Sequence, residues 1–244
     1  MTQFVVYKAL FGSYDKIEPI NSELVQGNTD YFVISDIELI LPAPWKLIQV
    51  ERKFDSYALE NRFYKMNGLD WFKNYKRSIY LDGNINFTGS LDRLLETLDT
   101  DKDIYAFNHP KRSNVTDEFK ACLIYNKITI QEYLESTREA YQPFKDAKIE
   151  MFECGILIRN PKSSILSAAM TEWFELFENN IRRDQLYFPF IIVKHNLKIG
   201  SLGISNIRNN SEFFSIKAHT HKTRWVDRKK VLLYKKLNKL FKWL

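Results

Sequence analysis

Three consecutive residues, Asp82, Gly83 and Asn84, end an apolar run and have the types and spacing of a cation site. Side chains two residues apart in an extended chain project to the same side, and a glycine between them permits close approach. A hard divalent cation such as Mn²⁺ or Mg²⁺ prefers oxygen ligands and needs few carboxylates when phosphate oxygens complete its coordination. We therefore expect a metal bridging a diphosphate here. The alternative is a turn in which both side chains bond their own backbone.

Short apolar segments alternate along the chain with segments of helical spacing. The short segments are rich in β-branched and aromatic residues, which predicts strands at 4–10, 30–35, 45–51, 77–82, 104–108 and 151–160. The others predict helices at 57–66, at 91–98 after a cap at Ser90, and at 130–140, 165–177 and 184–193. This alternation is typical of an α/β sandwich with a mainly parallel sheet, in which ligands bind at the carboxyl ends of the strands.

Composition is consistent with one large domain, which we place at residues 1–225. The chain has 244 residues, of which 45% are hydrophobic. This is enough for a substantial core. It has no apolar run long enough to span a membrane and no secretory signal pattern at its start, so we expect a cytoplasmic location. Cys122 and Cys154 lack metal-ligand spacing and are expected to be reduced.

The net charge of +6 resides in the last nineteen residues, 226–244, which hold seven Lys or Arg and one Asp. Apolar residues there fall on one helical face, namely Leu233, Leu237, Leu240, Phe241 and Leu244. A basic amphipathic helix of this kind is typical of a peripheral membrane anchor. We expect it to bind the inner face of the plasma membrane; packing on the body or on a partner is the alternative. Nucleic acid would explain the charge but not the apolar stripe, and no nucleic-acid motif is present.

Several motifs together resemble those of glycosyltransferases with the GT-A fold. "YLDGNI" resembles the D-x-D element of family 8 enzymes, "FECGILIRN" resembles a later strand of theirs, and "RRDQLYF" resembles their D-Q-D-x-L-N segment, in the same order. "HTHKTRW" faintly resembles their closing element but lacks its Gly and Pro. Asn84 also replaces the second Asp of D-x-D, which removes one charge from the metal site.

A closer resemblance is to the glycosyltransferase-like domain shared by plant mucilage and turgor proteins and bacterial polysaccharide clusters. It rests on "YKALFGSYDK", the D-G-N form of the metal motif, "NHPKR" and R-D-Q, and it covers roughly residues 5–225. This resemblance implies a GT-A-type nucleotide-binding sandwich.

The resemblance also implies roles for individual residues. Asp82, Asn84 and His219 would bind the metal, and Glu153, Asp184 and Gln185 would lie beside the reacting sugar carbon. The donor would contact Leu10, Tyr14, Asp36, Arg62 and Lys222, and a sugar or the acceptor would contact His109. The alternatives are turn, cap or surface roles and, for the acids, a buried salt bridge with Arg159, Arg182 or Arg183.

The expected function is transfer of a sugar from a nucleotide-sugar, with a UDP-sugar favoured, to a hydroxyl of a lipid-linked or cell-surface polysaccharide. The family 8 motifs favour retention of configuration. A non-catalytic, membrane-tethered module that binds nucleotide or glycan is the alternative. A sugar-phosphate nucleotidyltransferase would need a better Gly-rich phosphate loop than "ALFGSYDK".

Overall fold

The central element is a seven-stranded sheet with the strand order β3-β2-β1-β4-β7-β6-β8. The computed structural model describes residues 3–12, 15–139, 150–208, 211–217 and 232. Every strand of this sheet except β7 runs in the same direction. This confirms the predicted α/β class with a mainly parallel sheet of GT-A type. The strands are β1 (Phe4–Ala9), β2 (Thr29–Ser35), β3 (Lys46–Gln49), β4 (Arg77–Leu81), β6 (Ile104–Asn108), β7 (Phe152–Arg159) and β8 (Ile199–Ile204).

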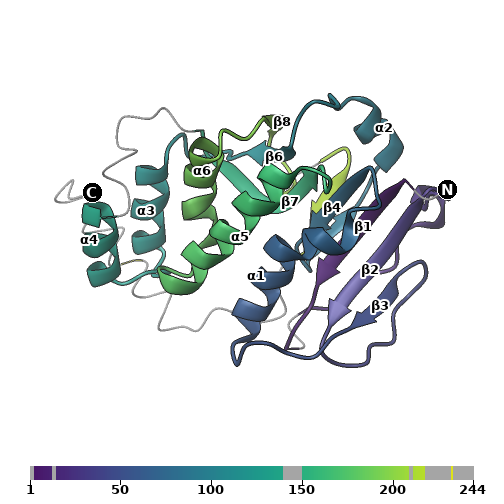
Figure 1. Ribbon diagram of the computed structural model, residues 1–244, viewed down its shortest axis with the longest axis horizontal. Coiled ribbons are helices and arrows are strands. Elements are labelled where there is room, and N and C mark those ends of the chain that lie inside the picture. The colour runs from purple at the N-terminus through teal and green to yellow at the C-terminus, as the bar shows by residue number, and fades with distance from the viewer. Residues whose placement is uncertain (1–2, 13–14, 140–149, 209–210, 218–231, 233–244) are drawn as a thin grey trace.

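Helices cover both faces of the sheet (Figure 1). One face packs against α1 (Tyr57–Asn67), α5 (Ser164–Asn179) and α6 (Asp184–Lys194), with α3 (Val115–Ile124) and α4 (Ile130–Glu139) beside them. The other face packs against α2 (Leu91–Glu96). Two 3-10 turns, Ser22–Leu24 and Gly68–Phe72, complete the helical elements of the described residues. In those residues no helix has the length and apolar character needed to cross a membrane.

Serine caps fix where three of these helices begin. The side chains of Ser56, Ser90 and Ser163 each accept a hydrogen bond from the backbone N–H three residues later. Each satisfies a donor that the first turn leaves unpaired. The predicted cap at Ser90 is thereby confirmed.

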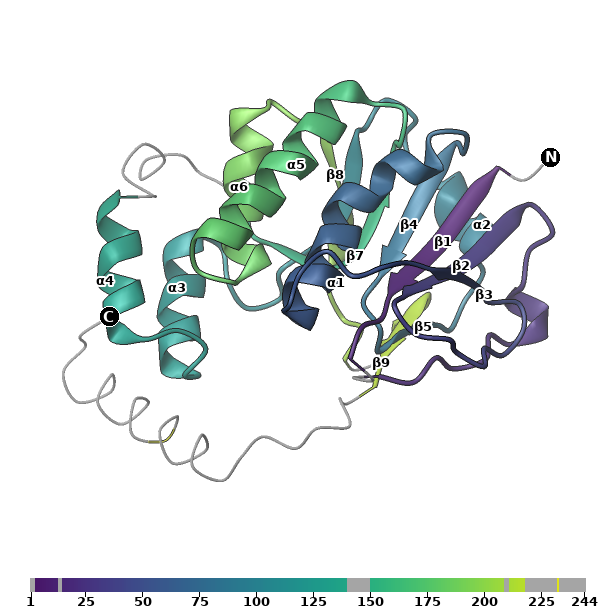
Figure 2. The same cartoon turned by 60° about the horizontal axis from the view of Figure 1, so that its bottom comes forward.

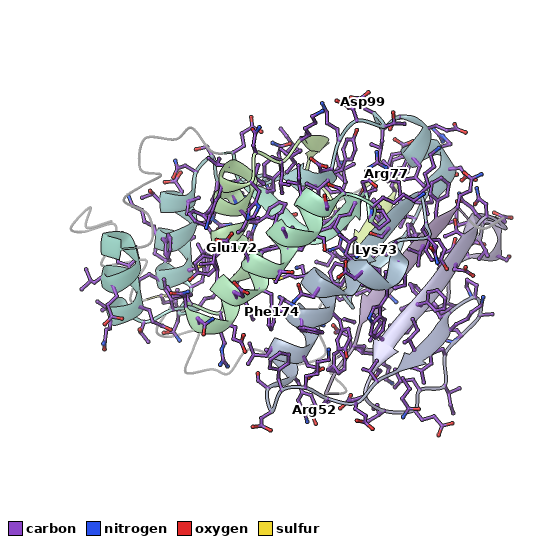
Figure 3. The ribbon with its side chains drawn as sticks, in the orientation of Figure 1. Arg52, Lys73, Arg77, Asp99, Glu172 and Phe174 are labelled. Carbon is purple, nitrogen blue, oxygen red and sulfur yellow. The ribbon has the colours of Figure 1, made fainter. Side chains whose placement is uncertain are left out.

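Phe174 of α5 points toward α1 (Figure 3), where its ring lies 5.4 Å from that of Phe63.

A small ribbon of two strands lies beside the main sheet (Figure 2). It pairs β5 (Ile85–Phe87) with β9 (Phe214–Ile216) in antiparallel fashion. Asn84 connects the segments that flank these two strands. Its carbonyl accepts the Lys217 N–H at 2.9 Å, and its side-chain Nδ2 donates to the Lys217 carbonyl at 2.8 Å. The ribbon therefore fixes the chain immediately after the Asp82–Asn84 motif.

We predict that Gly89→Ala destabilises the protein because this residue approaches the segment before β9 without room for a side chain. An added Cβ would lie 2.3 Å from the carbonyl oxygen of Glu212, a backbone atom. Overpacking of this kind costs about 1–3 kcal/mol. The matched control is Gly27→Ala, whose Cβ would meet nothing within 4 Å. Denaturant unfolding measures both variants; equal free energies of unfolding would contradict the prediction.

Candidate active site

Asp82 follows β4 at the edge of the sheet where the parallel strands end. Its N–H donates to the Gly155 carbonyl at 2.8 Å. Its Oδ1 accepts the Tyr80 hydroxyl at 3.0 Å and lies 3.6 Å from Lys65 Nζ. A Cβ at position 155 would lie 3.2 Å from Oδ2, so the glycine permits this close approach. The carboxylate is thus held in one orientation by β4, β7 and α1.

The reversed direction of β7 brings Glu153 to the same edge as Asp82. In the antiparallel register Leu81 opposes Ile156, so the beginning of β7 lies beside the end of β4. Asp82, Glu153 and Gln185 line one cavity of about 120 Å³. Its other lining residues are Ile85, Phe107, Cys154, Gly155, Ile156, Ile207, Arg208 and Ile216. The structure therefore brings together three residues that the sequence placed in the metal and catalytic sets.

Two side chains hold the Glu153 carboxylate in the cavity wall. Its Oε2 accepts a hydrogen bond from the Ser205 hydroxyl, and its Oε1 lies 3.7 Å from Arg208 Nη2. Gln185 is also fixed, since its Nε2 donates to the Phe152 carbonyl at 3.0 Å. Both residues are therefore positioned before any ligand binds.

Asp184 forms a buried ion cluster with two cations of α1 behind this cavity. Its Oδ2 lies 2.6 Å from Lys65 Nζ and 3.0 Å from Arg62 Nε. Burial alone would raise the pKa of Asp184, but Arg62 and Lys65 lower it far below the ordinary value, so the group stays ionised. Burial alone would lower the pKa of Arg62, whereas Asp184 and then Asp82 raise it above its usual value. A buried salt bridge of Asp184 therefore forms, as the sequence left open, but its partners are Lys65 and Arg62 of α1 and not the three arginines that the sequence suggested.

Lys8 of β1 shapes the loop that follows Asp82. This side chain is fully buried, and its Nζ donates to the carbonyls of Gly83 at 2.9 Å and Ile85 at 2.7 Å and to Asn86 Oδ1 at 3.2 Å. Burial lowers the pKa of Lys8 to about 8, against the opposing effects of Asp15 and Asp82. A lysine beneath the loop thus fixes the backbone of the Asp82–Asn84 motif.

The fit of a divalent cation rests on Asp82. One carboxylate is enough where phosphate oxygens supply most of the ligands. Within the described ranges, no group of three or more His, Cys, Asp or Glu residues is arranged to hold a metal ion. Asn84 lies two residues after Asp82, but its amide nitrogen donates to the Lys217 carbonyl. His219 lies outside the described residues, so its predicted role as a ligand stays a prediction.

The predicted donor residues lie across the first strands. Leu10 is buried in the core, and its N–H donates to the Ile34 carbonyl at 2.9 Å. Asp36, which follows β2, lines a groove of about 640 Å³ with Gln49, Val50, Glu51 and Arg52. Arg52, which is labelled in Figure 3 and lies in the segment that precedes α1, places its guanidinium 4.2 Å from the centre of the Tyr57 ring. Tyr14 and Lys222 lie outside the described residues, as does nearly all of the predicted helix 226–244.

His109 forms the turn after β6. Its Nδ1 accepts the N–H groups of Lys111 and Arg112, each at 3.1 Å, and its Nε2 lies 2.6 Å from Arg112 Nη1. Burial, followed by Arg112 and Arg208, lowers the pKa of His109 to about 4, so the ring is neutral at pH 7. This is the turn role that the sequence left as an alternative, and contact with a sugar stays a prediction.

Sequence reasoning did not identify Lys8, Lys65, Ser205 or Arg208 as part of the site. Signals existed for the two lysines. Lys65 follows Arg62 by three residues, which places both on one helix face, and Lys8 is a charged residue inside an apolar strand. Ser205 and Arg208 follow β8 in a loop without a distinctive pattern.

The sheet has the strand order and the reversed β7 of a GT-A-like sandwich. Polar residues gather at its carboxyl edge, where they line the cavity. No protein-family model matches the chain, and no curated protein matches it. The chain is similar in structure to WbbM, a bifunctional glycosyltransferase solved in its apo form. The similarity covers 96% of this chain and 44% of the WbbM chain, with 11% sequence identity and a TM-score of 0.49. The chain therefore spans less than half of that protein's length.

We predict that Asp184→Asn destabilises the protein by about 3–5 kcal/mol, because Lys65 and Arg62 would then be buried without their shared carboxylate. The pKa of Asp184 is lowered by folding, so its stabilisation is present above its unfolded pKa of about 3.9 and is lost as the pH falls below that value. The variant should therefore show a weaker loss of stability in acid.

Chemical denaturation from pH 7 down to pH 3 measures both effects. The matched control is Asp70→Asn, which removes an exposed pair with Lys73 (Figure 3) and should cost less than about 1 kcal/mol. A small effect of Asp184→Asn at pH 7, equal to that of the control, would show that the cluster contributes no more than a surface pair.

Proposed function

We propose that this protein is a glycosyltransferase that moves a sugar from a nucleotide-sugar, with a UDP-sugar favoured, to a hydroxyl of a lipid-linked or cell-surface polysaccharide. The observation that supports it most is the shared cavity of Asp82, Glu153 and Gln185 at the carboxyl edge of β4. These residues come from three separate motifs and line the same cavity, which supports the proposal. Ligands of open α/β sheets bind at this edge.

The chemistry requires stabilisation of a leaving diphosphate and of positive charge at the sugar. A divalent cation held by Asp82, with Asn84 and His219 as the further proposed ligands, would neutralise the diphosphate as it leaves. Glu153 faces the cavity and is the carboxylate placed to accept a proton from the acceptor hydroxyl or to stabilise an oxocarbenium-like sugar. Transfer with retention is favoured by the motif resemblance.

Asp184 has a different part in this proposal. Its Oδ2 contacts Lys65 and Arg62, and its Oδ1 accepts the Gln185 N–H at 3.0 Å. An ionised carboxylate with a strongly lowered pKa is a weak proton acceptor. Asp184 therefore positions Gln185 and the α1 cations, while Glu153 and Gln185 contact the reacting groups.

One observation favours a second candidate, a binding module without catalysis. The motif after β4 has one carboxylate, and the amide nitrogen of Asn84 bonds the Lys217 carbonyl. A site of lower charge binds metal less tightly, which suits retention of a nucleotide or glycan without turnover. Either activity would act at a membrane if residues 226–244 bind anionic lipid on the cytoplasmic side, as their composition favours.

We predict a manganese-dependent thermal shift with UDP that Asp82→Asn abolishes. A ligand at a hundredfold excess over Kd stabilises the native state by about 2.7 kcal/mol. EDTA should remove the shift from the wild-type protein. The matched control is Asp101→Asn, which removes an exposed acid and should retain the shift. No shift with UDP, GDP, CDP or their sugar conjugates would overturn the donor assignment.

We predict that Glu153→Gln lowers kcat for sugar transfer by about 10²–10⁴-fold, the usual contribution of a general acid or base, while UDP binding is unchanged. The isosteric amide still reaches Ser205 and keeps the shape of the cavity. Glu175→Gln, an exposed change on α5, is the control and should retain full activity. Steady-state kinetics with a radiolabelled UDP-sugar tests this prediction. If wild type binds UDP-sugar but no transfer or hydrolysis is detected with any acceptor, the binding module is favoured instead.

A further inference from the structure

Asn84 stands where a D-x-D motif has its second acid, and its side chain holds a distant segment of the chain. The residue is 7% exposed. Its Nδ2 donates to the Lys217 carbonyl at 2.8 Å, and its own carbonyl accepts the Lys217 N–H at 2.9 Å. A carbonyl oxygen can only accept a hydrogen bond, so the first contact requires the amide nitrogen. A carboxylate at position 84 would instead place two acceptors against each other.

The contact between Asn84 and Lys217 extends the β5–β9 ribbon toward the metal motif. Asn84 precedes Ile85, which pairs with Ile216 across the ribbon (Figure 2). Among the described residues, these two strands of three residues each pair only with one another. A two-stranded ribbon is marginally stable by itself. The Lys217 ammonium also lies 2.9 Å from Glu18, but an exposed ion pair adds little. The bonds with Asn84 are therefore important for keeping β9 in place.

β9 forms part of the cavity wall. Ile85 and Ile216, which face each other across the ribbon, both line the cavity. The Ile216 N–H donates to the carbonyl of Ile207 at 3.3 Å, and Ile207 and Arg208 are further lining residues. Arg208 Nη2 in turn lies 3.7 Å from the Glu153 carboxylate. A displacement of β9 would therefore change the wall that faces Glu153.

The first part of the metal motif is held without help from β9. Lys8 Nζ donates to the Gly83 carbonyl at 2.9 Å, and the Asp82 N–H donates to the Gly155 carbonyl at 2.8 Å. These contacts come from β1 and β7. Loss of the Asn84 side chain would thus leave Asp82 in its orientation and release β9.

We propose that Asn84 is a positioning residue of the active site: its amide joins the metal motif to β9 and so sets the cavity wall that faces Glu153. This inference rests on the proposed function and gives Asn84 a part in it that does not depend on ligating the cation. It also explains why an amide stands at this position. An aspartate would add charge to the cation site but would lack the donor that the Lys217 carbonyl requires.

The test compares Asn84→Ala and Asn84→Asp with the wild type, using the full chain. Alanine removes the donor, and aspartate replaces it with a second acceptor. The matched control is Asn160→Asp at the opposite edge of the sheet, where Oδ1 accepts the Lys162 N–H and an aspartate can do the same. Two quantities are measured: the hydrogen exchange rates of the β9 amides without ligand, and kcat for sugar transfer at increasing Mn²⁺ concentration.

Both Asn84 variants should exchange the amides of Ile216 and Lys217 at least about tenfold faster than the wild type and the control, because local opening of β9 no longer breaks the side-chain bond. The value of kcat should fall from wild type to Asn84→Ala and further to Asn84→Asp, and saturating Mn²⁺ should not restore it. A residue that only ligates the cation predicts the opposite order of the two variants, recovery of Asn84→Ala in excess Mn²⁺ and unchanged exchange. Any one of these three results overturns the proposal.

Faster exchange with unchanged kcat would make the contact purely structural and would also overturn it. If Asn84→Asp does not fold, Asn84→Ala decides alone through its exchange rates and its response to Mn²⁺. A wild type that transfers no sugar contradicts the proposed function itself, and affinity for the UDP-sugar then replaces kcat in the comparison. Unchanged exchange in variants of a wild type that does transfer sugar contradicts this inference only.

Discussion

The buried contact between Lys65 of α1 and Asp184 of α6 is the interaction on which the arrangement of this site depends. Lys65 Nζ lies 2.6 Å from Asp184 and 3.6 Å from Asp82, so one ammonium links two helices to the end of β4. Charges are stable away from water only when opposite charges or hydrogen bonds accompany them. The relative positions of α1, α6 and β4 are therefore restricted to those that keep these groups together.

Arg159 extends the same constraint into the sheet. It is fully buried in β7; its Nη1 donates to the Lys65 carbonyl at 2.7 Å, and its Nη2 bonds the Tyr7 hydroxyl. Tyr7 in turn donates to the Lys65 carbonyl at 3.2 Å. The last turn of α1 is thus held from β1 and β7 together. Because Glu153 lies near the other end of β7, one strand joins the support of Lys65 to the cavity wall.

Local pattern was enough to predict most of the fold. The strands around Tyr80 and Ile156 and the helix containing Trp173 carry strong apolar periodicity, and all were predicted within a few residues. Helix α3 and strand β8 were not predicted. β8 contains two glycines and is largely exposed, since it is the outermost strand of the sheet. Its sequence therefore lacks the apolar pattern by which the buried strands were predicted. Its place beside β6 is set by pairing that only the folded chain shows.

The candidate site was predictable as a set of residues but not as a set of contacts. Motif resemblance placed Asp82, Glu153 and Gln185 near one another, and the cavity brings them together. The partners of Asp184 were not found from sequence: the partners considered were Arg159, Arg182 and Arg183, whereas the carboxylate pairs with Lys65 and Arg62, 119 and 122 positions away. Long-range pairing of charges depends on packing between helices, which spacing within one segment does not contain.

Charge pairing then distinguishes two kinds of cation around the cavity. Lys65 and Arg62 lie behind it, each beside a carboxylate, and their charges are used within the folded chain. Arg208 instead lines the cavity itself, with its side chain 64% exposed and its Nη2 3.7 Å from Glu153. An exposed ion pair contributes little to stability. The charge of Arg208 is therefore accessible to a ligand in the cavity, whereas the buried cations keep the cavity in shape.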